Sequence, residues 1–512
     1  MGGGDHHCEW RDQVPVLQAA LAAANAAANA RIAEQDRTIA TLVEQLTSMR
    51  ATVEKLQRHV FGKRSEKMPP IAEAIRDPER AEAERVAALQ TRRENAELKR
   101  QLVTRRIEHK LRDDQKVCPK CGGHDFTKLG EGLMTELFEL IPSFVERQLH
   151  VQEKARCRCG ETIITADVPD KVFDKARIGP NFMAQVVVSK CADSMPLYRQ
   201  AKAYQRVGVQ VNDSTLGDYF HRVAEITKPI SNRLLEQVPL SEHVLADETT
   251  NRVQAKGKTR TAWLWDFIAR DPADKEIIAF VFSPSRSGDT PARVLGDSLG
   301  KLLVDGYAGY NKVTAPGGRA RAGCLAHARR GFFDAQSQAP EAAQQAIELI
   351  LQVYRIERAA RDAGIVGTPK HLELRQTESR AVMDKLKAWL DAEKGRHLPK
   401  GPMGEAIGYA LGQWDALTLF LTDPKLPLDN NASERALRVA ALGRKNFLFV
   451  GNDAAGENLA GLYSILATCE ANGVNPVAYL ADVMMRVGNH PASRIDEILP
   501  QNWTPPAPKP SA

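Results

Sequence analysis

Three acidic residues, Asp247, Asp305 and Glu434, constrain the fold of this chain more than any other feature of its sequence. Apolar runs at 244–246 and 302–304 lead into the two aspartates, so both stand at predicted strand ends. Glu434 stands in the first turn of a helix that follows a run of capping residues. Carboxylates in the order strand, strand, helix predict a site for Mg²⁺ or Mn²⁺, which prefer hard oxygen ligands.

Each carboxylate taken singly also has a structural explanation. The two aspartates could cap strand ends, and Glu434 could pair with Arg438 four residues later. The neighbouring acids Glu248 and Asp429 are expected to hold no metal, so substituting them should leave substantial activity. The hypothesis of one shared metal site therefore rests on the three residues together.

The pattern around these residues predicts an α/β sheet with a helical insertion. Three sequential strands, expected to be antiparallel, precede two short strands that alternate with helices. This is the element order of a ribonuclease-H-like domain, which we infer by analogy. An almost wholly helical stretch then separates the last strand from the helix that carries Glu434. The expected strands are 244–250, 261–267, 276–282, 301–305 and 323–327, a helix is expected from 289 to about 299, and the insertion is expected at about 339–422.

A heptad of apolar residues from Ile32 to Val60 predicts a coiled coil that forms a homodimer or a higher oligomer. The alternative is one amphipathic helix packed within the chain.

A basic cluster follows the heptad segment, and Arg58, Lys63 and Arg64 in it are candidates for phosphate contact. A solvated surface explains them equally well. The segment 77–111 is charged and helix-prone.

Four clustered cysteines, Cys118, Cys121, Cys157 and Cys159, predict a structural zinc site. The first pair has the spacing and following glycines of a zinc knuckle, and the second pair is Cys-x-Cys. His150 or His124 could replace one thiolate. Because four soft ligands leave zinc no open position, the site is expected to stabilise folding or a DNA-facing ribbon.

The segment 175–235 predicts three helices, two of which resemble a helix-turn-helix with Arg199, Lys202 and Arg206 available for phosphates. A small helical domain without DNA contact fits the same pattern.

Further candidates for DNA contact lie in the later half of the chain. They are His327 and Arg329, which could meet the scissile phosphate, and Arg444 and Lys445, which could hold terminal DNA.

The composition permits a nucleic-acid partner without requiring one, because the net charge is only +6 and the pI about 8.8. The sequence shows no long uninterrupted apolar run and no signal-peptide pattern at its start. We therefore expect no membrane contact and a cytoplasmic, nucleoid-associated bacterial protein. The expected organisation is multidomain α+β, with a coiled-coil region at 1–110, a zinc knuckle at 111–170, a helical region at 175–235, the ribonuclease-H-like domain at 240–450 and C-terminal helices with a disordered tail at 451–512.

Several of these segments together resemble the transposases of the insertion-sequence 66 family, over nearly the whole chain from about Leu56 to Trp503. The most specific segments are His59-Val60-Phe61-Gly62-Lys63-Arg64-Ser65-Glu66-Lys67, Cys118-Pro119-Lys120-Cys121-Gly122, Ala246-Asp247-Glu248-Thr249, Asp305-Gly306-Tyr307-Ala308-Gly309-Tyr310, Asp429-Asn430-Asn431-Ala432-Ser433-Glu434-Arg435-Ala436-Leu437-Arg438 and Gly443-Arg444-Lys445-Asn446-Phe447. Two features depart from the pattern. The second cysteine pair is spaced as Cys-x-Cys, which is tighter than a typical second knuckle. The Tyr-x-x-Arg-x-x-x-Glu signature of other DDE transposases does not surround Glu434.

The resemblance implies a DDE transposase that cleaves and joins the DNA ends of an insertion sequence. It implies Asp247, Asp305 and Glu434 as catalytic, metal-binding residues, with Asp247 shared by two Mg²⁺ or Mn²⁺ ions, together with bound Zn²⁺. The implied partners are the DNA of the element's ends and of the target, with helper proteins of the same element as further candidates. Two other functions fit the residues: a non-catalytic zinc-dependent DNA-binding protein, and a structure-specific nuclease that cuts without joining.

Overall fold

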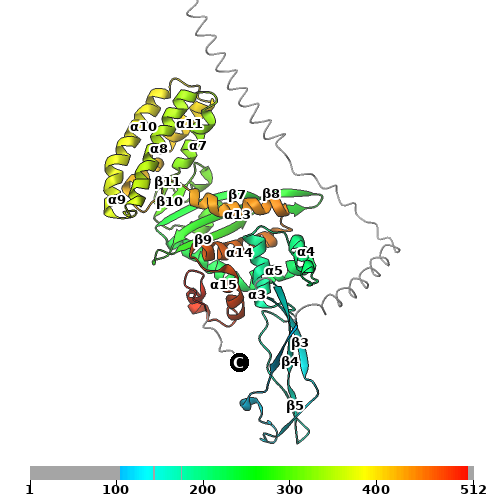
Figure 1. The fold of residues 1–512 in the computed structure, drawn as a ribbon. Helices are drawn as coiled ribbons and strands as arrows, with labels where there is room; N and C mark the ends of the chain where they lie inside the picture. Colours follow the sequence, from blue (N-terminus) through cyan, green and yellow to red (C-terminus); the bar gives the residue numbers. More distant parts are fainter. Residues whose placement is uncertain (1–103, 142–143, 175, 506–512) are drawn as a thin grey trace, which may run out of the picture. The chain divides into compact units, whose positions relative to one another are not determined.

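The computed structural model describes residues 104–141, 144–174 and 176–505 (Figure 1). The predicted coiled coil at 32–60 and the basic residues Arg58, Lys63 and Arg64 lie outside this part of the chain. The described residues form two compact units. One is the helical insertion, made of His327–Val366 and Lys370–Trp414, and the other holds Gly367–Pro369 and the remaining described residues.

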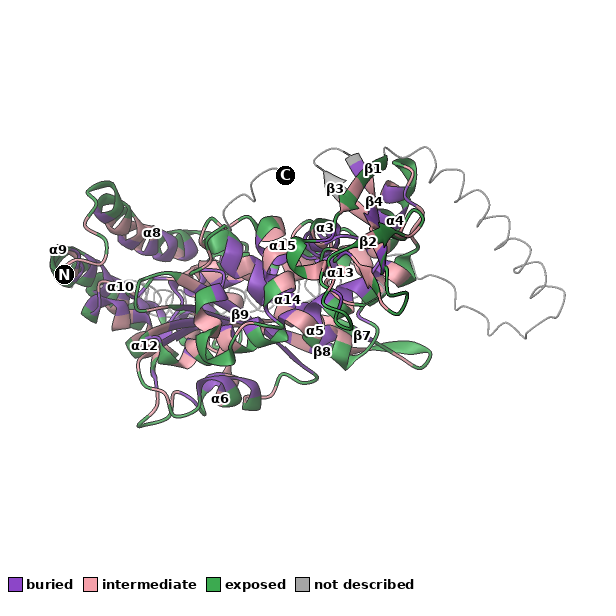
Figure 2. Cartoon of the chain, turned by 90° about the horizontal axis from the view of Figure 1, so that it is seen from below, coloured by how far each residue is buried: buried purple, intermediate pink, exposed green. Residues whose placement is uncertain are grey.

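A five-stranded sheet forms the core of the larger unit. Its strands are β7 (His243–Ala255), β8 (Lys258–Arg270), β9 (Glu276–Ser283), β10 (Lys301–Val304) and β11 (Ala320–Gly323), in the order β11-β10-β7-β8-β9. The first three strands pair antiparallel, as predicted, whereas β10 pairs parallel with β7 and β11 pairs parallel with β10. Strands β7, β8 and β9 are the longest and carry most of the buried side chains of this sheet, whereas the turn of the β7–β8 hairpin is exposed (Figure 2).

Two predicted boundaries in this region were wrong. The strand expected at 323–327 ends at Gly323, and helix α7 (Leu325–Ala335) begins two residues later. The helix expected to reach about Leu299 is α6 (Asp289–Leu295), which stops before Gly296. Gly296 has φ +52°, a left-handed conformation that glycine adopts readily and that ends a helix.

Helices α5 (Asp213–Gln237), α13 (Asn431–Phe447) and α14 (Asp453–Ala471) pack against this sheet. Strand β9 lies at the sheet edge, where backbone groups need partners. The hydroxyls of Ser464 and Thr468 on α14 accept the amides of Phe280 and Ile278 at 2.7 and 3.1 Å. Helix α14 thereby closes the edge of the sheet by hydrogen bonding as well as by packing.

The predicted helices of the segment 175–235 are confirmed as α3 (Pro180–Cys191), α4 (Leu197–Arg206) and α5. Asn212 caps α5 by accepting the amide of Thr215 at 2.9 Å. Helix α3 is apolar around most of its circumference, and it packs on α15 (Pro476–Arg486) and α5. A 3₁₀ segment, Ala492–Ile498, completes this C-terminal part.

The region before α3 consists of two small three-stranded sheets. One contains β1 (Thr104–His109), β4 (Phe144–Gln152) and β3 (Leu133–Ile141), and the other contains β2 (Phe126–Lys128), β5 (Lys154–Cys157) and β6 (Ile163–Thr165). The helical expectation for 77–111 was wrong where the structure describes it, because β1 pairs in parallel with β4. Pairing with a neighbouring strand outweighs a weak helix propensity.

The insertion is a bundle of α8 (Pro340–Asp362), α9 (Pro369–Leu374), α10 (Arg380–Glu393) and α11 (Pro402–Gly412), preceded by most of α7, whereas α12 (Trp414–Thr418) belongs almost wholly to the larger unit. Between α9 and α10 the segment Arg375–Ser379 is a π-helix. The buried Arg375 donates to Glu357 at 2.7 and 2.8 Å, so its charge is paired. The helical insertion predicted at about 339–422 is confirmed as helical.

Within the described residues, no helix combines the length and apolar character needed to cross a membrane.

Candidate metal centres and active site

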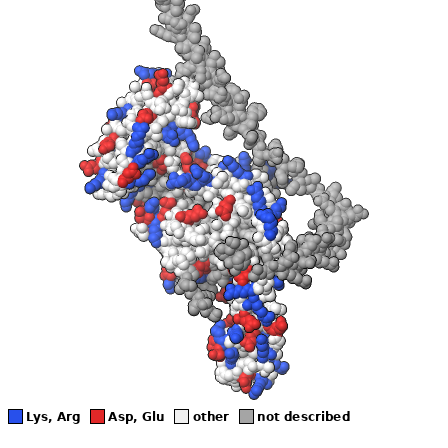
Figure 3. Space-filling model, in the orientation of Figure 1, with Lys and Arg blue, Asp and Glu red and all other residues white. Residues whose placement is uncertain are grey.

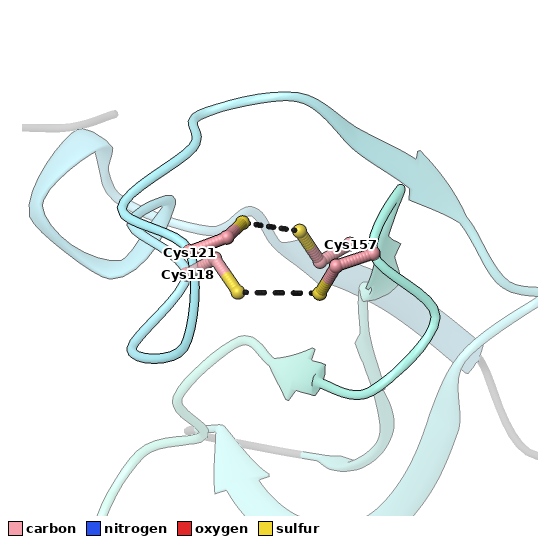
Figure 4. Close-up of side chains that lie close together, drawn as sticks. Cys118, Cys121 and Cys157 are labelled. Atoms are coloured by element: carbon pink, nitrogen blue, oxygen red, sulfur yellow. Dashed lines mark hydrogen bonds between the residues drawn. The ribbon is translucent and has the colours of Figure 1, made fainter.

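The four clustered cysteines converge as the sequence predicts (Figure 4). Cys118 and Cys121 lie on the turn before β2, whereas Cys157 ends β5 and Cys159 follows it. Sulfur atoms are 3.7 Å apart between Cys118 and Cys159 and 3.5 Å apart between Cys121 and Cys157, and all four lie within 4.8 Å of one another. Tetrahedral zinc with bonds of about 2.3 Å requires neighbouring sulfurs about 3.8 Å apart, so the cluster fits the ion.

Two glycine turns aim these thiols at one point. Gly122 and Gly160 have φ of +68° and +76°, and their amides donate to the carbonyls of Cys118 and Cys157 at 2.8 and 2.9 Å. The Thr162 hydroxyl, followed by backbone amides, lowers the pKa of Cys118 to about 6, which favours the thiolate that zinc binds. A core as small as Leu111, Ala155 and Ala166 needs such a metal to hold it.

Neither candidate histidine joins the cysteine cluster. The buried His150 hydrogen-bonds through Nδ1 to Nε2 of His109 at 2.8 Å, and its ring stacks on that residue. His124 hydrogen-bonds to the backbone oxygen of Lys116 at 3.1 Å. The four thiols are therefore the candidate ligands of a zinc ion.

The three predicted carboxylates come from three different elements of the larger unit. Asp247 lies within β7, Asp305 directly follows β10, and Glu434 lies in the first turn of α13. Strands β7 and β10 are neighbours, and α13 packs on β7, so the fold brings the three elements to one region. Unlike the cysteines, the three do not form a cluster with all ligand atoms within 4.8 Å, so their spacing exceeds that of a single-ion site.

Electrostatics link these residues. Burial, followed by the charges of Glu248, Asp305 and Glu434, raises the pKa of Asp247 to about 7, against a hydrogen bond from the Glu248 amide. A carboxylate surrounded by like charges is stabilised when a cation neutralises them.

Asp266 on β8 is a fourth carboxylate behind this group, and it was not predicted from the sequence. It lies opposite Asp247 in the strand ladder, and its Oδ1 accepts the Asp247 amide at 3.1 Å. The residue is fully buried, and burial followed by the charge of Asp247 raises its pKa well above the usual range. A single aspartate within the aromatic run Trp265-Asp266-Phe267 was the signal that could have identified it.

Glu248, which was expected to hold no metal, makes structural contacts that the sequence did not indicate. Its side chain is only 1% exposed, and Oε1 accepts from Nε of Arg286 at 2.8 Å while Oε2 accepts from the Tyr310 hydroxyl at 2.7 Å. The guanidinium of Arg286 lies over the rings of Tyr307 and Trp263, 3.9 and 4.9 Å from their centroids. These contacts tie β7 to the segments that follow β9 and β10.

The turn that carries Asp305 is fixed at several points. Oδ1 of Asp305 accepts the amide of Tyr307 at 2.9 Å. Arg321 donates to the carbonyl oxygens of Asp305 and Tyr307 at 2.6 and 2.8 Å. With Tyr310 bonded to Glu248, the orientation of Asp305 depends on residues that do not themselves belong to the predicted triad.

Asn430 fixes the start of α13 in a way the sequence did not indicate. The run of capping residues offered Asn430 or Asn431 as the cap; Asn430 is at the N-cap position, but its side chain makes no capping bond. Instead its Nδ2 donates to the carbonyl of Ala246 at 2.8 Å, and it is fully buried. The residue preceding Asp247 and the residue four positions before Glu434 are thus joined directly.

The predicted DNA-contact residues differ in their availability. Arg444 is half-buried and donates to the hydroxyls of Thr249 and Thr250 at 3.2 and 2.8 Å, so it fastens α13 to β7. Lys445, Arg199 and Arg206 are exposed. His327 and Arg329 both lie on α7 in the insertion unit, so Arg329 is on a helix after a short strand as expected, whereas His327, expected at the end of that strand, is also on the helix.

Glu242, His243 and Asp423 form a second group with metal-ligand atoms near one another. His243 Nε2 lies 2.6 Å from Asp423, and the ammonium of Lys301 also pairs with that carboxylate. Although burial opposes it, hydrogen bonds from Lys301 and His243 hold the pKa of Asp423 well below its usual range. Because Lys301 already supplies a positive charge, this group is an internal ion pair of the larger unit that joins the segment after Leu419–Thr422 to β7 and β10.

Comparison with known proteins agrees with this arrangement. The model of the transposase IS66 family matches residues 175–458, the IS66 C-terminal element matches 464–501, and the zinc-finger binding domain of transposase IS66 matches 115–160. These regions define a transposase with a zinc-finger domain. The chain belongs to the IS66 family of transposases.

Three relatives come from Sinorhizobium fredii (strain NBRC 101917 / NGR234). Uncharacterized protein y4qI is 31% identical over 97% of this chain and 98% of its own length. Uncharacterized protein y4hP is 31% identical over 76% and 73%, and Uncharacterized protein y4jD is 32% identical over 77% and 79%. The similarity to y4qI therefore extends over nearly the whole of both chains.

Proposed function

We propose that this protein is a DDE transposase in which Asp247, Asp305 and Glu434 form the catalytic metal site. The proposal is carried by the position of the three residues on adjoining elements, where burial of Asp247, followed by the charges of Glu248, Asp305 and Glu434, raises its pKa. Repulsion of this kind costs free energy in the metal-free protein, and a divalent cation relieves it. Oxygen ligands favour Mg²⁺ or Mn²⁺.

The topology supports a ribonuclease-H-like assignment for the sheet. Three antiparallel strands followed by two parallel strands, with the first strand at the centre, is the order and direction that the assignment requires. The helical insertion stands between the last strand and the helix that bears Glu434. Each proposed ligand thereby comes from a separate element, and the sheet holds two of them at adjacent strands.

In this proposal, each group of the chain has a defined task. Metal ions held by the triad would activate the attacking oxygen and stabilise the leaving one. Asp266 holds the Asp247 backbone, and Arg321 holds that of Asp305. The zinc-binding domain and the exposed basic residues would position DNA, and the predicted coiled coil would bring two chains to the two element ends.

A joint cleavage and joining assay tests the proposal against its two alternatives. The chain is incubated with Mg²⁺, a fragment carrying both ends of its own element, and a target plasmid. A transposase yields cut ends and then joined products. Cut ends without joined products indicate a nuclease, and binding without cutting indicates a non-catalytic DNA-binding protein.

A further inference from the structure

Helices α4 and α13 present an uneven distribution of charge. Helix α4 carries three basic residues and no acidic one, and α13 carries four basic residues and a single acidic one, Glu434. Six of the seven basic side chains are exposed, and none of the six forms a salt bridge with a residue that the structure describes. They are Arg199, Lys202 and Arg206 on α4 and Arg435, Arg438 and Lys445 on α13.

The two helices belong to one surface of the larger unit. The hydroxyl of Ser194, just before α4, donates to the carbonyl of Val439 on α13 at 3.5 Å. On α3, the ammonium of Lys190 lies 4.1 Å from the ring centroid of Phe447 at the end of α13. Figure 3 shows Lys and Arg side chains gathered over the end of α13 and the neighbouring α4. The unpaired cations therefore form a continuous basic surface, which we call the α4–α13 surface.

Exposed apolar side chains lie within this basic surface. Leu442 on α13 is 47% exposed, and Leu448 and Phe449, directly after the helix, are 40% and 41% exposed. Leu448 has φ +62°, a conformation that non-glycine residues adopt only when their surroundings enforce it. The next residue but one, Val450, supplies that constraint, because its backbone makes two hydrogen bonds of 2.8 Å with β7. Phe449 is thus held outward on a fixed turn.

The exposed residues of α13 follow one stripe that starts beside the carboxylates. Arg435, Arg438, Leu442 and Lys445 are spaced by three and four residues, so they share one helix face. From Glu434 to Lys445 the helix rises about 16 Å at 1.5 Å per residue. This length matches about five nucleotides of one DNA strand at about 3.4 Å each.

We propose that the α4–α13 surface binds the DNA strand that flanks the cleavage position, with phosphates on Arg435, Arg438 and Lys445 and an exposed base against Phe449. The inference rests on the proposed function, since it takes the triad as the place of cleavage. Basic residues interleaved with exposed apolar and aromatic side chains suit a nucleic acid, in which phosphates need cations and unpaired bases need a stacking surface. Helix α4, with Tyr198 beside two of its three cations, continues the surface for the more distant phosphates.

Salt dependence of DNA binding tests the phosphate contacts. The probe is a labelled duplex taken from the end of the element, and its dissociation constant is measured at several salt concentrations. Removing one phosphate contact reduces the slope of log K against log salt by about 0.9 for duplex DNA. The double variant Arg438→Ala/Lys445→Ala should therefore reduce the slope by close to two. The control is Lys228→Ala/Arg293→Ala, which removes two exposed charges outside this surface and should leave the slope near the wild-type value.

Equal slopes for the two double variants would overturn the proposal, provided that zinc content and circular dichroism show both to be folded. The result is independent of catalysis, because binding is measured without Mg²⁺. A changed slope together with absent cleavage by the wild-type chain would support this surface and contradict the proposed function. An unchanged slope together with normal cleavage would contradict this surface and support the proposed function.

Base stacking on Phe449 has a separate readout. A pre-cut element end carrying 2-aminopurine at its terminal nucleotides reports stacking as a loss of fluorescence. Wild type and Phe449→Trp should quench the probe, whereas Phe449→Ala should not. Leu442→Ala, a change at another exposed apolar residue of the same surface, should quench as wild type does. Equal quenching by Phe449→Ala and wild type would remove the base contact from the proposal.

Discussion

Asp266 lies directly opposite Asp247 in the β7–β8 ladder, and its Oδ1 accepts the Asp247 amide at 3.1 Å. Because Asp266 is fully buried with a raised pKa, a neutral side chain of the same shape should replace it. Asp266→Asn should fold and nick DNA nearly as well as wild type. Asp266→Ala leaves the Asp247 amide without its acceptor and should cost about 1–3 kcal/mol of unfolding free energy.

Urea unfolding measures the stability of both Asp266 variants, and the nicking assay measures their activity. If Asp266→Asn were as inactive as a triad variant, Asp266 would act as an ionised catalytic group and not as a backbone acceptor.

Substituting Glu248 should reduce activity although it is not proposed to bind metal. Glu248→Ala leaves the buried Tyr310 hydroxyl without its acceptor and Arg286 without its ion pair, at a cost of about 1–3 kcal/mol. The turn that carries Asp305 then loses its tether to β7, so the rate of nicking should fall while DNA binding is retained. Glu242→Ala, at an exposed residue near the start of β7, is the control. Wild-type rates for Glu248→Ala would show that Asp305 is positioned without this tether.

Binding of Mg²⁺ should release protons in a pH-dependent manner. With a pKa of about 7, Asp247 is mostly protonated at pH 6 and mostly ionised at pH 8. A divalent cation binds the ionised form, so binding should release close to one proton per site at pH 6 and only a small fraction of a proton per site at pH 8. Calorimetry in buffers of different ionisation enthalpy measures the release. Proton release at pH 6 that is unchanged in Asp247→Asn would contradict the assignment.

The stability of the chain without bound Mg²⁺ or Mn²⁺ should follow from the same group. The folded-state pKa of Asp247 lies above that of the unfolded chain, so its proton favours the folded state. This contribution is fully present below about pH 4 and is lost as the pH rises to about 7. Asp247→Asn should flatten that part of the stability profile, which thermal unfolding of the zinc-loaded chain in buffer without Mg²⁺ or Mn²⁺ measures.

The zinc site should be structural. Cys121→Ser removes one of the four converging thiols, so the variant should lose its zinc and the two small sheets around residues 104–170 should unfold. Metal analysis and limited proteolysis report the two effects, and Cys191→Ser, at a buried cysteine outside the cluster, should keep its zinc. Stoichiometric zinc in Cys121→Ser would mean that three thiols suffice.

Local pattern was enough to predict much of this fold. Alternating apolar residues predicted β7, β8 and β9, and Asn212 predicted the start of α5, because these signals act within a few residues. The strand β1 was missed, since its conformation comes from pairing with β4 some forty residues away. Tertiary contacts of that kind override local propensity.

The residues of the candidate site also divide into those that the local sequence predicted and those that it did not. Motif and spacing predicted the cluster of four cysteines, whose thiols converge in the structure, and suggested the triad. Asp266 and Arg286 were not predicted, because each acts through a partner distant in sequence, on a neighbouring strand or a following turn. Arg444 was assigned to DNA from its charge, but its hydrogen bonds to Thr249 and Thr250 show that the guanidinium fastens α13 to β7.

Mg²⁺-dependent nicking of the element's own ends by Asp305→Asn and Glu434→Gln tests the central claim most directly. Both changes keep the size of the side chain and remove one proposed metal ligand, so each should abolish nicking while DNA binding stays close to that of wild type. Asp297→Asn, at an exposed aspartate after α6, should nick normally. Retained nicking by Asp305→Asn or Glu434→Gln would contradict the proposed triad.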